Sequence, residues 1–141
     1  MSLIRLAELS DAIELQRLND LFNGENCNSL EGIARSLANN KHELVCVADN
    51  GEILIGFCCA QIGKSMCYPM TFAEITELFV QEQYRSQGYG RQLLQFMELQ
   101  LDQLDVRHYH ILTNMSNHIA KELYRSSGYV ETDEILLDKN T

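Results

Sequence analysis

Two glycines and two arginines gather in one short polar run near the middle of the chain, Arg85-Ser86-Gln87-Gly88-Tyr89-Gly90-Arg91. The first backbone N–H groups of a helix have no partner inside it, and the helix dipole adds positive potential at that end. Glycine lets the backbone approach a ligand closely or adopt a positive φ. The run therefore has the composition of a pyrophosphate site, although a loop that only caps a helix has the same composition.

The run lies between a predicted strand and a predicted helix. Residues 72–80 are rich in β-branched and aromatic side chains and roughly alternate between apolar and polar, which predicts a strand. Downstream, apolar side chains recur every three to four residues, which predicts an amphipathic helix; they are Tyr89, Leu93, Phe96, Met97, Leu101 and Leu104. A loop that runs directly into a helix in this way directs several unpaired amides at one point.

Two common nucleotide-binding loops do not fit the sequence. The dinucleotide pattern G-x-G-x-x-G fails because Leu93 stands where its third glycine is needed. The segment Gly63-Lys64-Ser65 resembles the end of a Walker loop, but Cys58 occupies the leading glycine position and no helix pattern follows. These mismatches argue against both patterns.

A different pattern, R-x-x-G-x-G, is carried by Arg85, Gly88 and Gly90. A second motif follows later in the chain, with the residues Asn117, Ala120, Leu123, Tyr124, Gly128 and Tyr129 in the spacing N-x-x-A-x-x-L-Y-x-x-x-G-Y. In this order the two motifs resemble the acetyl-CoA loop and the late helix of the GNAT superfamily of N-acetyltransferases. The resemblance extends over nearly the whole chain and says almost nothing about the acetyl acceptor.

The resemblance implies acetyl-CoA as co-substrate and assigns residues to it. Main-chain groups of Phe79 and Val80 would pair with the pantetheine arm, and Asn117 would contact pantetheine or only cap its helix. The pyrophosphate would be held by the backbone of Arg85, Ser86, Gln87, Gly88, Tyr89 and Gly90. The side chains of Arg85 and Arg91 would either add charge there or face solvent.

The same resemblance places Tyr124 where the family has its general acid, the group that protonates the departing thiolate. The alternative is a helix tyrosine whose ring only packs on the sheet. Glu77, next to Leu78 on the central strand, is the first candidate for a base, with Glu74 and Glu82 as further candidates. These carboxylates could equally bind a cationic acceptor or simply be exposed.

The net charge of −9 over 141 residues disfavours nucleic acid as a partner, since phosphate neutralisation needs clustered lysine and arginine. It favours a cationic small-molecule amine as acceptor, although acidity alone also keeps a protein soluble. A protein N-terminus or lysine as acceptor, or a non-catalytic domain that only binds acyl-CoA, are the alternatives.

Metal and membrane partners are not expected. The five cysteines lack zinc-type spacing, and the face shared by His108 and His110 offers no third ligand. The longest apolar run, residues 53–62, is too short to span a bilayer, and no charged-then-apolar leader opens the chain. A cytoplasmic protein with reduced thiols is the expectation.

The pattern of elements predicts one α/β (α+β) domain over residues 1–141, in the order β-α-α-β-β-β-α-β-α-β. This is also the order of the GNAT fold, which implies a mixed, mostly antiparallel sheet of six to seven strands with helices on both faces. The last strand is expected over residues 129–137, where its edge could serve a homodimer.

Overall fold

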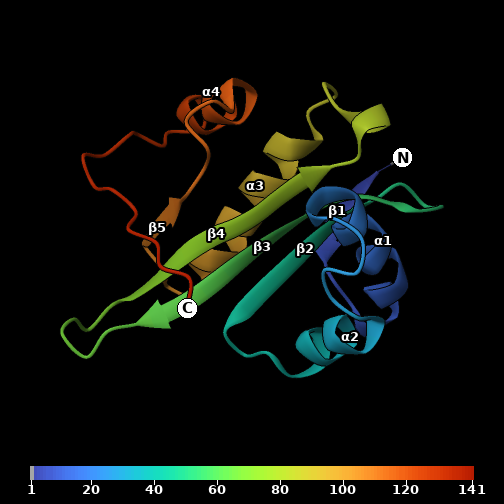
Figure 1. Ribbon diagram of the computed structural model, residues 1–141, viewed down its shortest axis with the longest axis horizontal. Helices are drawn as coiled ribbons and strands as arrows, with labels where there is room; N and C mark the ends of the chain where they lie inside the picture. Colours follow the sequence, from blue (N-terminus) through green and yellow to red (C-terminus); the bar gives the residue numbers. More distant parts are fainter. Residues whose placement is uncertain (1) are drawn as a thin grey trace.

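The computed structural model describes residues 2–141, which form one sheet and its covering helices (Figure 1). The elements are β1 (Leu3–Leu6), a 3₁₀ turn (Leu9–Asp11), α1 (Ala12–Asn23), α2 (Leu30–Asn39), β2 (Glu43–Asp49), β3 (Leu54–Lys64), β4 (Thr71–Val80), a second 3₁₀ turn (Glu82–Tyr84), α3 (Tyr89–Gln103), β5 (His108–Ile111) and α4 (His118–Ser126). No helix among these residues is both long and apolar enough to cross a membrane.

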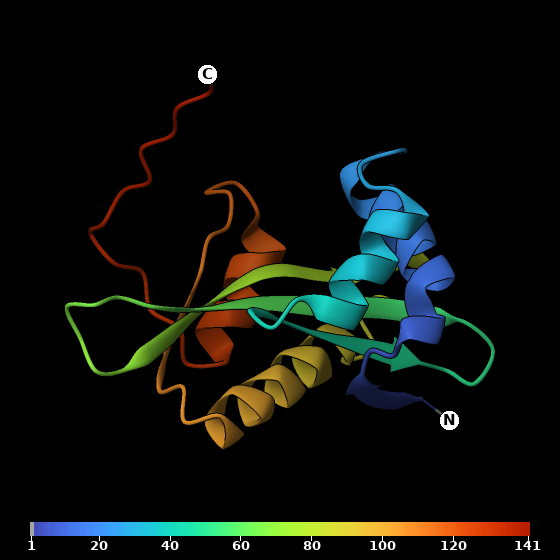
Figure 2. The ribbon, with the colours of Figure 1, turned by 90° about the horizontal axis from the view of Figure 1, so that it is seen from below.

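The five strands lie in the order β1-β2-β3-β4-β5. The first four are antiparallel to their neighbours, whereas β5 runs parallel to β4 after the crossover through α3. Helices α1 and α2 lie on one side of the sheet and α3 on the other (Figure 2). The predicted mixed sheet with helices on both faces is confirmed.

Two apolar clusters hold these layers together. The larger lies between the sheet and α3 and contains Leu93, Leu94, Met97 and Leu101, all fully buried. The smaller lies under α1 and is built around Leu18. Cys46 and Cys58 belong to the larger cluster and Cys59 to the smaller, and all five cysteines of the chain are free thiols.

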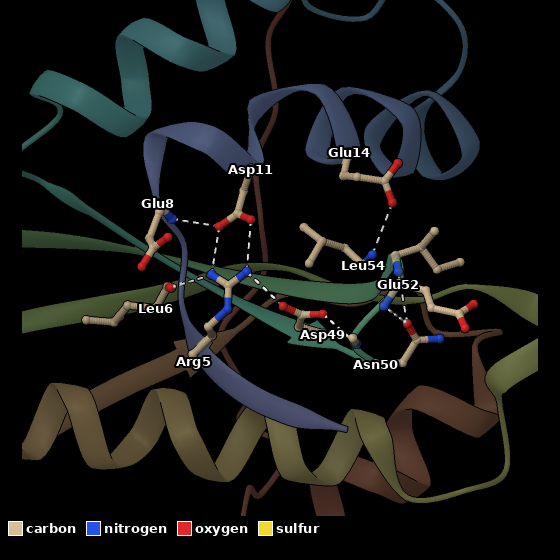
Figure 3. Close-up of polar contacts among 11 residues, drawn as sticks. Arg5, Leu6, Glu8, Asp11, Glu14, Asp49, Asn50, Glu52 and Leu54 are labelled. Carbon is tan, nitrogen blue, oxygen red and sulfur yellow. Dashed lines mark hydrogen bonds and ion pairs between the residues drawn. The ribbon is translucent and has the colours of Figure 1, made fainter. Parts of the chain in front are cut away.

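A network of ion pairs joins the start of the chain to the sheet (Figure 3). The guanidinium of Arg5 donates to both carboxylate oxygens of Asp11, at 2.8 and 3.0 Å, and to Asp49 at 3.0 Å. The Asp11 carboxylate also accepts the N–H of Glu8 at 2.7 Å. Because β1, the first 3₁₀ turn and the end of β2 all contribute, the network fixes how α1 begins over the sheet.

The prediction of six to seven strands is wrong, because the sheet formed by residues 2–141 has five strands. The expected strand over residues 129–137 is absent, and no helix or strand follows α4. Its apolar side chains Val130, Ile135, Leu136 and Leu137 are between 69 and 84 % exposed. A strand requires a partner for its backbone groups, and no strand edge of residues 2–141 pairs with this segment.

Candidate active site

The centre of the site is the outer edge of β4. Strand β5 pairs only with the first half of β4, from Phe72 to Ile75, so the second half has no neighbour on that side within residues 2–141. The N–H of Gln81 donates to the carbonyl of Ile55 at 2.8 Å, which directs Gln81 toward β3. Since backbone groups alternate in direction along a strand, Leu78 and Val80 present theirs to the open side. Phe79 is directed toward its partner Phe57 on β3.

A β-bulge in β4 separates these two halves. Cys59 pairs with Glu77 and the next residue of β3, Ala60, pairs with Ile75, which leaves Thr76 as the extra residue. The bulge brings Thr76 and Glu77 to the same side of the sheet, where both line one cavity. It also bends β4 at the point where its pairing with β5 stops.

The loop after β4 leaves its amides free. Ser86 and Gly88 have positive φ values of 63° and 89°, and Gly88 is the residue that precedes α3. No side chain caps α3, and within residues 2–141 no acceptor hydrogen-bonds to the N–H groups from Ser86 to Arg91. The exposed loop and the start of α3 therefore contain several unpaired N–H donors, as an anion site requires.

Both arginines of the loop are exposed, and each also makes hydrogen bonds within the described chain. Arg85 donates from Nε to the carbonyl of Val80 at 2.7 Å and lies 5.6 Å from the centre of the Phe79 ring. Arg91 donates to the hydroxyl groups of Ser126 at 2.6 Å and Ser127 at 3.4 Å, which links α3 to the end of α4. Their hydrogen bonds thus hold the loop and α4 in place around the free amides.

Tyr124 on α4 packs against the cluster between the sheet and α3. Its ring lies 6.1 Å from that of Tyr129, and within residues 2–141 no group hydrogen-bonds to its hydroxyl. Burial, with a smaller contribution from the nearby Cys58 thiol, raises the pKa of Tyr124 above its ordinary value. The hydroxyl is therefore protonated at neutral pH and has a hydrogen to donate.

The remaining predicted contacts lie near the loop before α3, the start of α4 and the end of β4. Asn117 precedes α4, and its side-chain oxygen accepts the N–H of Ala120 at 3.1 Å, so it does cap the helix. Tyr89 shares a hydrogen bond of 2.8 Å with the hydroxyl of Ser2, which ties the start of α3 to the residue before β1. Phe79 is buried and stacks on Phe22 at 4.9 Å between ring centres.

An acidic cavity of about 550 Å³ opens on the side of the sheet that carries α1 and α2. Its walls include Glu43, Glu74 and Glu77, together with Gln61. Burial raises the pKa of Glu43, and the negative charge of Glu77 adds to this increase. Burial likewise raises the pKa of Glu77, an effect that the Asn23 side chain partly offsets. The cavity thus holds carboxylates that a bound cation would stabilise.

One polar row crosses four strands, and its members on β2, β3 and β4 line this cavity. Glu43, Gln61, Glu74 and His110 are successive partners on β2, β3, β4 and β5. The Glu74 carboxylate pairs with Nε2 of His110 at 3.0 Å. The further candidate Glu82 is exposed in the second 3₁₀ turn and does not line the cavity. Among residues 2–141 no three histidine, cysteine or acidic side chains converge as metal ligands.

The sequence reasoning missed two features of the site. The bulge at Thr76 leaves no mark in a strand that alternates only roughly, and Glu43 was not among the candidate residues. The turn after β2 could have indicated that β2 lies beside β3. With this pairing, the alternation of side chains along β2 could have indicated that Glu43 faces the same side of the sheet as Gln61.

Comparison with known proteins agrees with this geometry. A family model described as an acetyltransferase (GNAT) domain matches residues 41–131. An uncharacterized N-acetyltransferase of Bacillus subtilis (strain 168), YfmK, is 27 % identical over 94 residues, which cover 67 % of this chain and 59 % of that protein. The match therefore spans less than two thirds of the length of this relative.

Solved structures share the fold at low identity. An aminoglycoside acetyltransferase from an uncultured soil metagenomic sample, in complex with sisomicin, has a TM-score of 0.86 at 18 % identity and covers 99 % of this chain and 95 % of its own. AAC(6')-Iy, in complex with a bisubstrate analogue of CoA, has a TM-score of 0.85 at 18 % identity, with coverage of 100 and 99 %.

A ribosomal-protein-alanine N-acetyltransferase from Brucella melitensis biovar Abortus 2308 has a TM-score of 0.82 at 13 % identity, with coverage of 99 and 100 %. These neighbours show the fold alone. The family model, by contrast, matches well over half of the chain. The chain therefore belongs to the acetyltransferase (GNAT) family.

Proposed function

We propose that the protein transfers an acetyl group from acetyl-CoA to the primary amine of a small cationic molecule, by direct attack with both substrates bound. The observation that carries this proposal is that two sets of unpaired backbone groups follow each other closely along the chain. The open edge of β4 ends at Val80, and the free amides begin at Ser86, only a 3₁₀ turn further along the chain.

The donor fits this arrangement. The amides from Ser86 to Arg91 would hold the pyrophosphate at the start of α3, where the helix dipole favours negative charge. The outward N–H and C=O groups of Leu78 and the outward N–H of Val80 would pair with the amides of the pantetheine arm, as a strand edge pairs with a peptide, whereas the Val80 carbonyl accepts from Arg85. Asn117, whose side-chain N–H₂ is not used in capping, would contact the same arm.

The acid–base chemistry is assigned to two side chains. The co-substrate supplies an acetyl group activated as a thioester, and the amine nitrogen forms the new C–N bond as the C–S bond breaks. The Tyr124 hydroxyl donates a proton to the departing sulfur, and Glu77 accepts a proton from the attacking amine, directly or through water. An outward N–H of the β4 edge stabilises the negative charge that develops on the carbonyl oxygen. Orientation of both reactants in line supplies much of the rate.

The acidic cavity supports a cationic acceptor. Glu43, Glu74 and Glu77 surround a space of about 550 Å³, which suits a small molecule better than a polypeptide. Two of the fold neighbours are acetyltransferases that act on aminoglycosides, which are polycationic amines. Because the raised pKa values of Glu43 and Glu77 reflect unfavourable burial of negative charge, a bound ammonium group would relieve that cost.

The test measures thiol release from acetyl-CoA with a panel of polyamines, aminoglycosides and amino-acid amines, and with peptides that carry free N-termini. We expect turnover with cationic small amines and a loss of at least about tenfold in kcat/KM for Glu77→Gln. Tight CoA binding without turnover on any amine would contradict the proposal and indicate a binding domain. Turnover on peptides alone would keep the transferase and overturn the acceptor class.

A further inference from the structure

Helix α4, which carries the proposed acid Tyr124, contributes little to the core. None of its nine residues is buried, and Ile119 is 87 % exposed. A short helix in a protein is stabilised mainly by the packing of its apolar face. Because α4 buries so little of that face, its position and the direction of Tyr124 depend on individual contacts.

Tyr129 makes two of these contacts just after α4 ends. Its N–H donates to the carbonyl of Tyr124 at 3.0 Å, and the N–H of Gly128 donates to the carbonyl of Arg125, also at 3.0 Å. Gly128 has φ of 97°, so the chain leaves the helix through the left-handed turn that is common at helix ends. This turn folds Tyr129 back onto the helix, with its ring edge-on to that of Tyr124 and 6.1 Å between the ring centres.

A hydrogen bond to α3 fixes the Tyr129 ring in this place. The Tyr129 hydroxyl donates to the carboxylate of Glu98 at 2.7 Å. Glu98 is held firmly, since Met97 and Leu101 on the same helix are fully buried. Burial and the Glu98 carboxylate both raise the pKa of Tyr129, so the hydroxyl stays protonated and remains a donor. Hydrogen bonds to a carboxylate are roughly twice as strong as those between neutral groups.

The Tyr124 ring lies beside the open half of β4. It packs with Leu78 on the cluster that contains Cys58, and Cys58 is the residue of β3 that pairs with Leu78. No group of residues 2–141 hydrogen-bonds to the Tyr124 hydroxyl, so packing alone directs it. The helix end brings the ring of Tyr129 to that of Tyr124, and the bond to Glu98 prevents the Tyr129 ring from turning away.

We propose that Glu98 and Tyr129 are positioning residues for acetyl transfer. Their hydrogen bond holds the Tyr129 ring against Tyr124 and so keeps the Tyr124 hydroxyl directed toward the sulfur of bound acetyl-CoA. The proposal rests on the function proposed above, in which Tyr124 protonates the departing thiolate. Tyr129 is not itself the acid, because Glu98 engages its hydrogen. A displacement of about 1 Å at the reacting groups can lower a rate about a hundredfold, so a contact outside them can control kcat.

The substitution Tyr129→Phe removes the hydroxyl, keeps the ring and so tests the hydrogen bond. We expect kcat to fall at least about tenfold, with little change in KM for acetyl-CoA or for the amine. Glu98→Leu should show the same loss, whereas Glu98→Gln, which keeps an acceptor oxygen, should recover most of the lost kcat. The matched control is Tyr109→Phe, which should leave kcat unchanged. The Tyr109 ring lies 6.3 Å from that of Tyr129, but its hydroxyl bonds to no group of residues 2–141.

A double-mutant cycle separates positioning from a general loss of structure. In a chain that already carries Tyr124→Phe, the further change Tyr129→Phe should leave kcat as it is, because the hydroxyl that Tyr129 positions is gone. An equal loss of kcat in both backgrounds, an unchanged kcat in Tyr129→Phe alone, or a Glu98→Gln variant as slow as Glu98→Leu would each overturn the proposal. Circular dichroism verifies that each variant is folded.

A measurement without turnover keeps this test separate from the test of the acetyltransferase activity. In protein labelled with ¹³C at the tyrosine Cζ atoms, the Tyr124 resonance is identified by its loss in Tyr124→Phe. We expect one sharp line in the unaltered chain and a broadened or divided line in Tyr129→Phe and Glu98→Leu, because the ring then samples further orientations. An equally sharp Tyr124 line in Tyr129→Phe would overturn the positioning role, whether or not the protein acetylates an amine.

Discussion

Tyr124 combines the properties that a proton donor needs at neutral pH. Its pKa is raised by burial, so the hydroxyl carries its hydrogen, and within residues 2–141 no other group accepts that hydrogen. It also lies on α4, which the hydrogen bonds from Arg91 to Ser126 and Ser127 hold next to the start of α3. A tyrosine in this position is therefore held close to the loop proposed to bind the donor.

The substitution Tyr124→Phe removes the hydroxyl and keeps the ring that packs on the sheet. We expect kcat to fall about 100-fold or more, because general acid catalysis typically contributes that much, while CoA affinity measured by calorimetry stays the same. The matched control is Tyr84→Phe, which removes a hydroxyl from another partly buried tyrosine of the same cluster. An unchanged kcat in Tyr124→Phe would show that another group protonates the sulfur.

At the scale of single elements, the loop before α3 depends on a backbone conformation that glycine favours. Gly88 has φ of 89° and ψ of 4°, and an added Cβ would meet only the end of the Gln92 side chain, at 3.8 Å. The constraint on this position is therefore the dihedral angle and not the space. A change of that angle would turn the free amides away from their common point.

Gly88→Ala should lower the free energy of unfolding by about 1 kcal/mol and weaken CoA binding at least about tenfold. Gly51→Ala is the control, since Gly51 has φ of 94° and open space around it in the turn between β2 and β3. It should lose similar stability in a denaturant titration and keep full CoA affinity. Equal CoA affinity in the two variants would mean that the loop amides do not bind the pyrophosphate.

The sequence predicted the individual strands and helices better than it predicted which strands pair with one another. The strand, loop and helix around Gly88 follow from local periodicity and turn chemistry, and the structure has all three. Apolar character alone does not give the buried face of α1, because Ile13 is 69 % exposed whereas Leu15 is buried. The bulge at Thr76 and the missing last strand depend on pairing between strands, and alternation along one segment carries no information about its partner.

At the scale of the whole molecule, two groups of carboxylates give opposite dependence of stability on pH. The pKa of Asp11 is lowered by its hydrogen bonds with Arg5, and that of Glu14 by hydrogen bonds from Arg17. Such groups stabilise the fold at pH values above their unfolded pKa, and this stability is lost as pH falls through the folded pKa. The pKa values of Glu43 and Glu77 are raised, so these two groups have the opposite effect on stability. Their ionisation at neutral pH opposes folding, and this cost disappears as the pH falls and the carboxylates become protonated.

Asp11→Asn should therefore lower the free energy of unfolding at pH 7 by about 2–3 kcal/mol, because it leaves Arg5 with one carboxylate in place of two. The deficit should shrink as pH falls below the unfolded value of 3.8, where the native Asp11 also becomes protonated. Glu43→Gln should stabilise the protein at pH 7, with no difference left well below pH 4.5. Urea titrations across this pH range measure both changes. A deficit in Asp11→Asn that stayed constant down to the lowest pH would show that Asp11 acts through shape and hydrogen bonding instead of through charge.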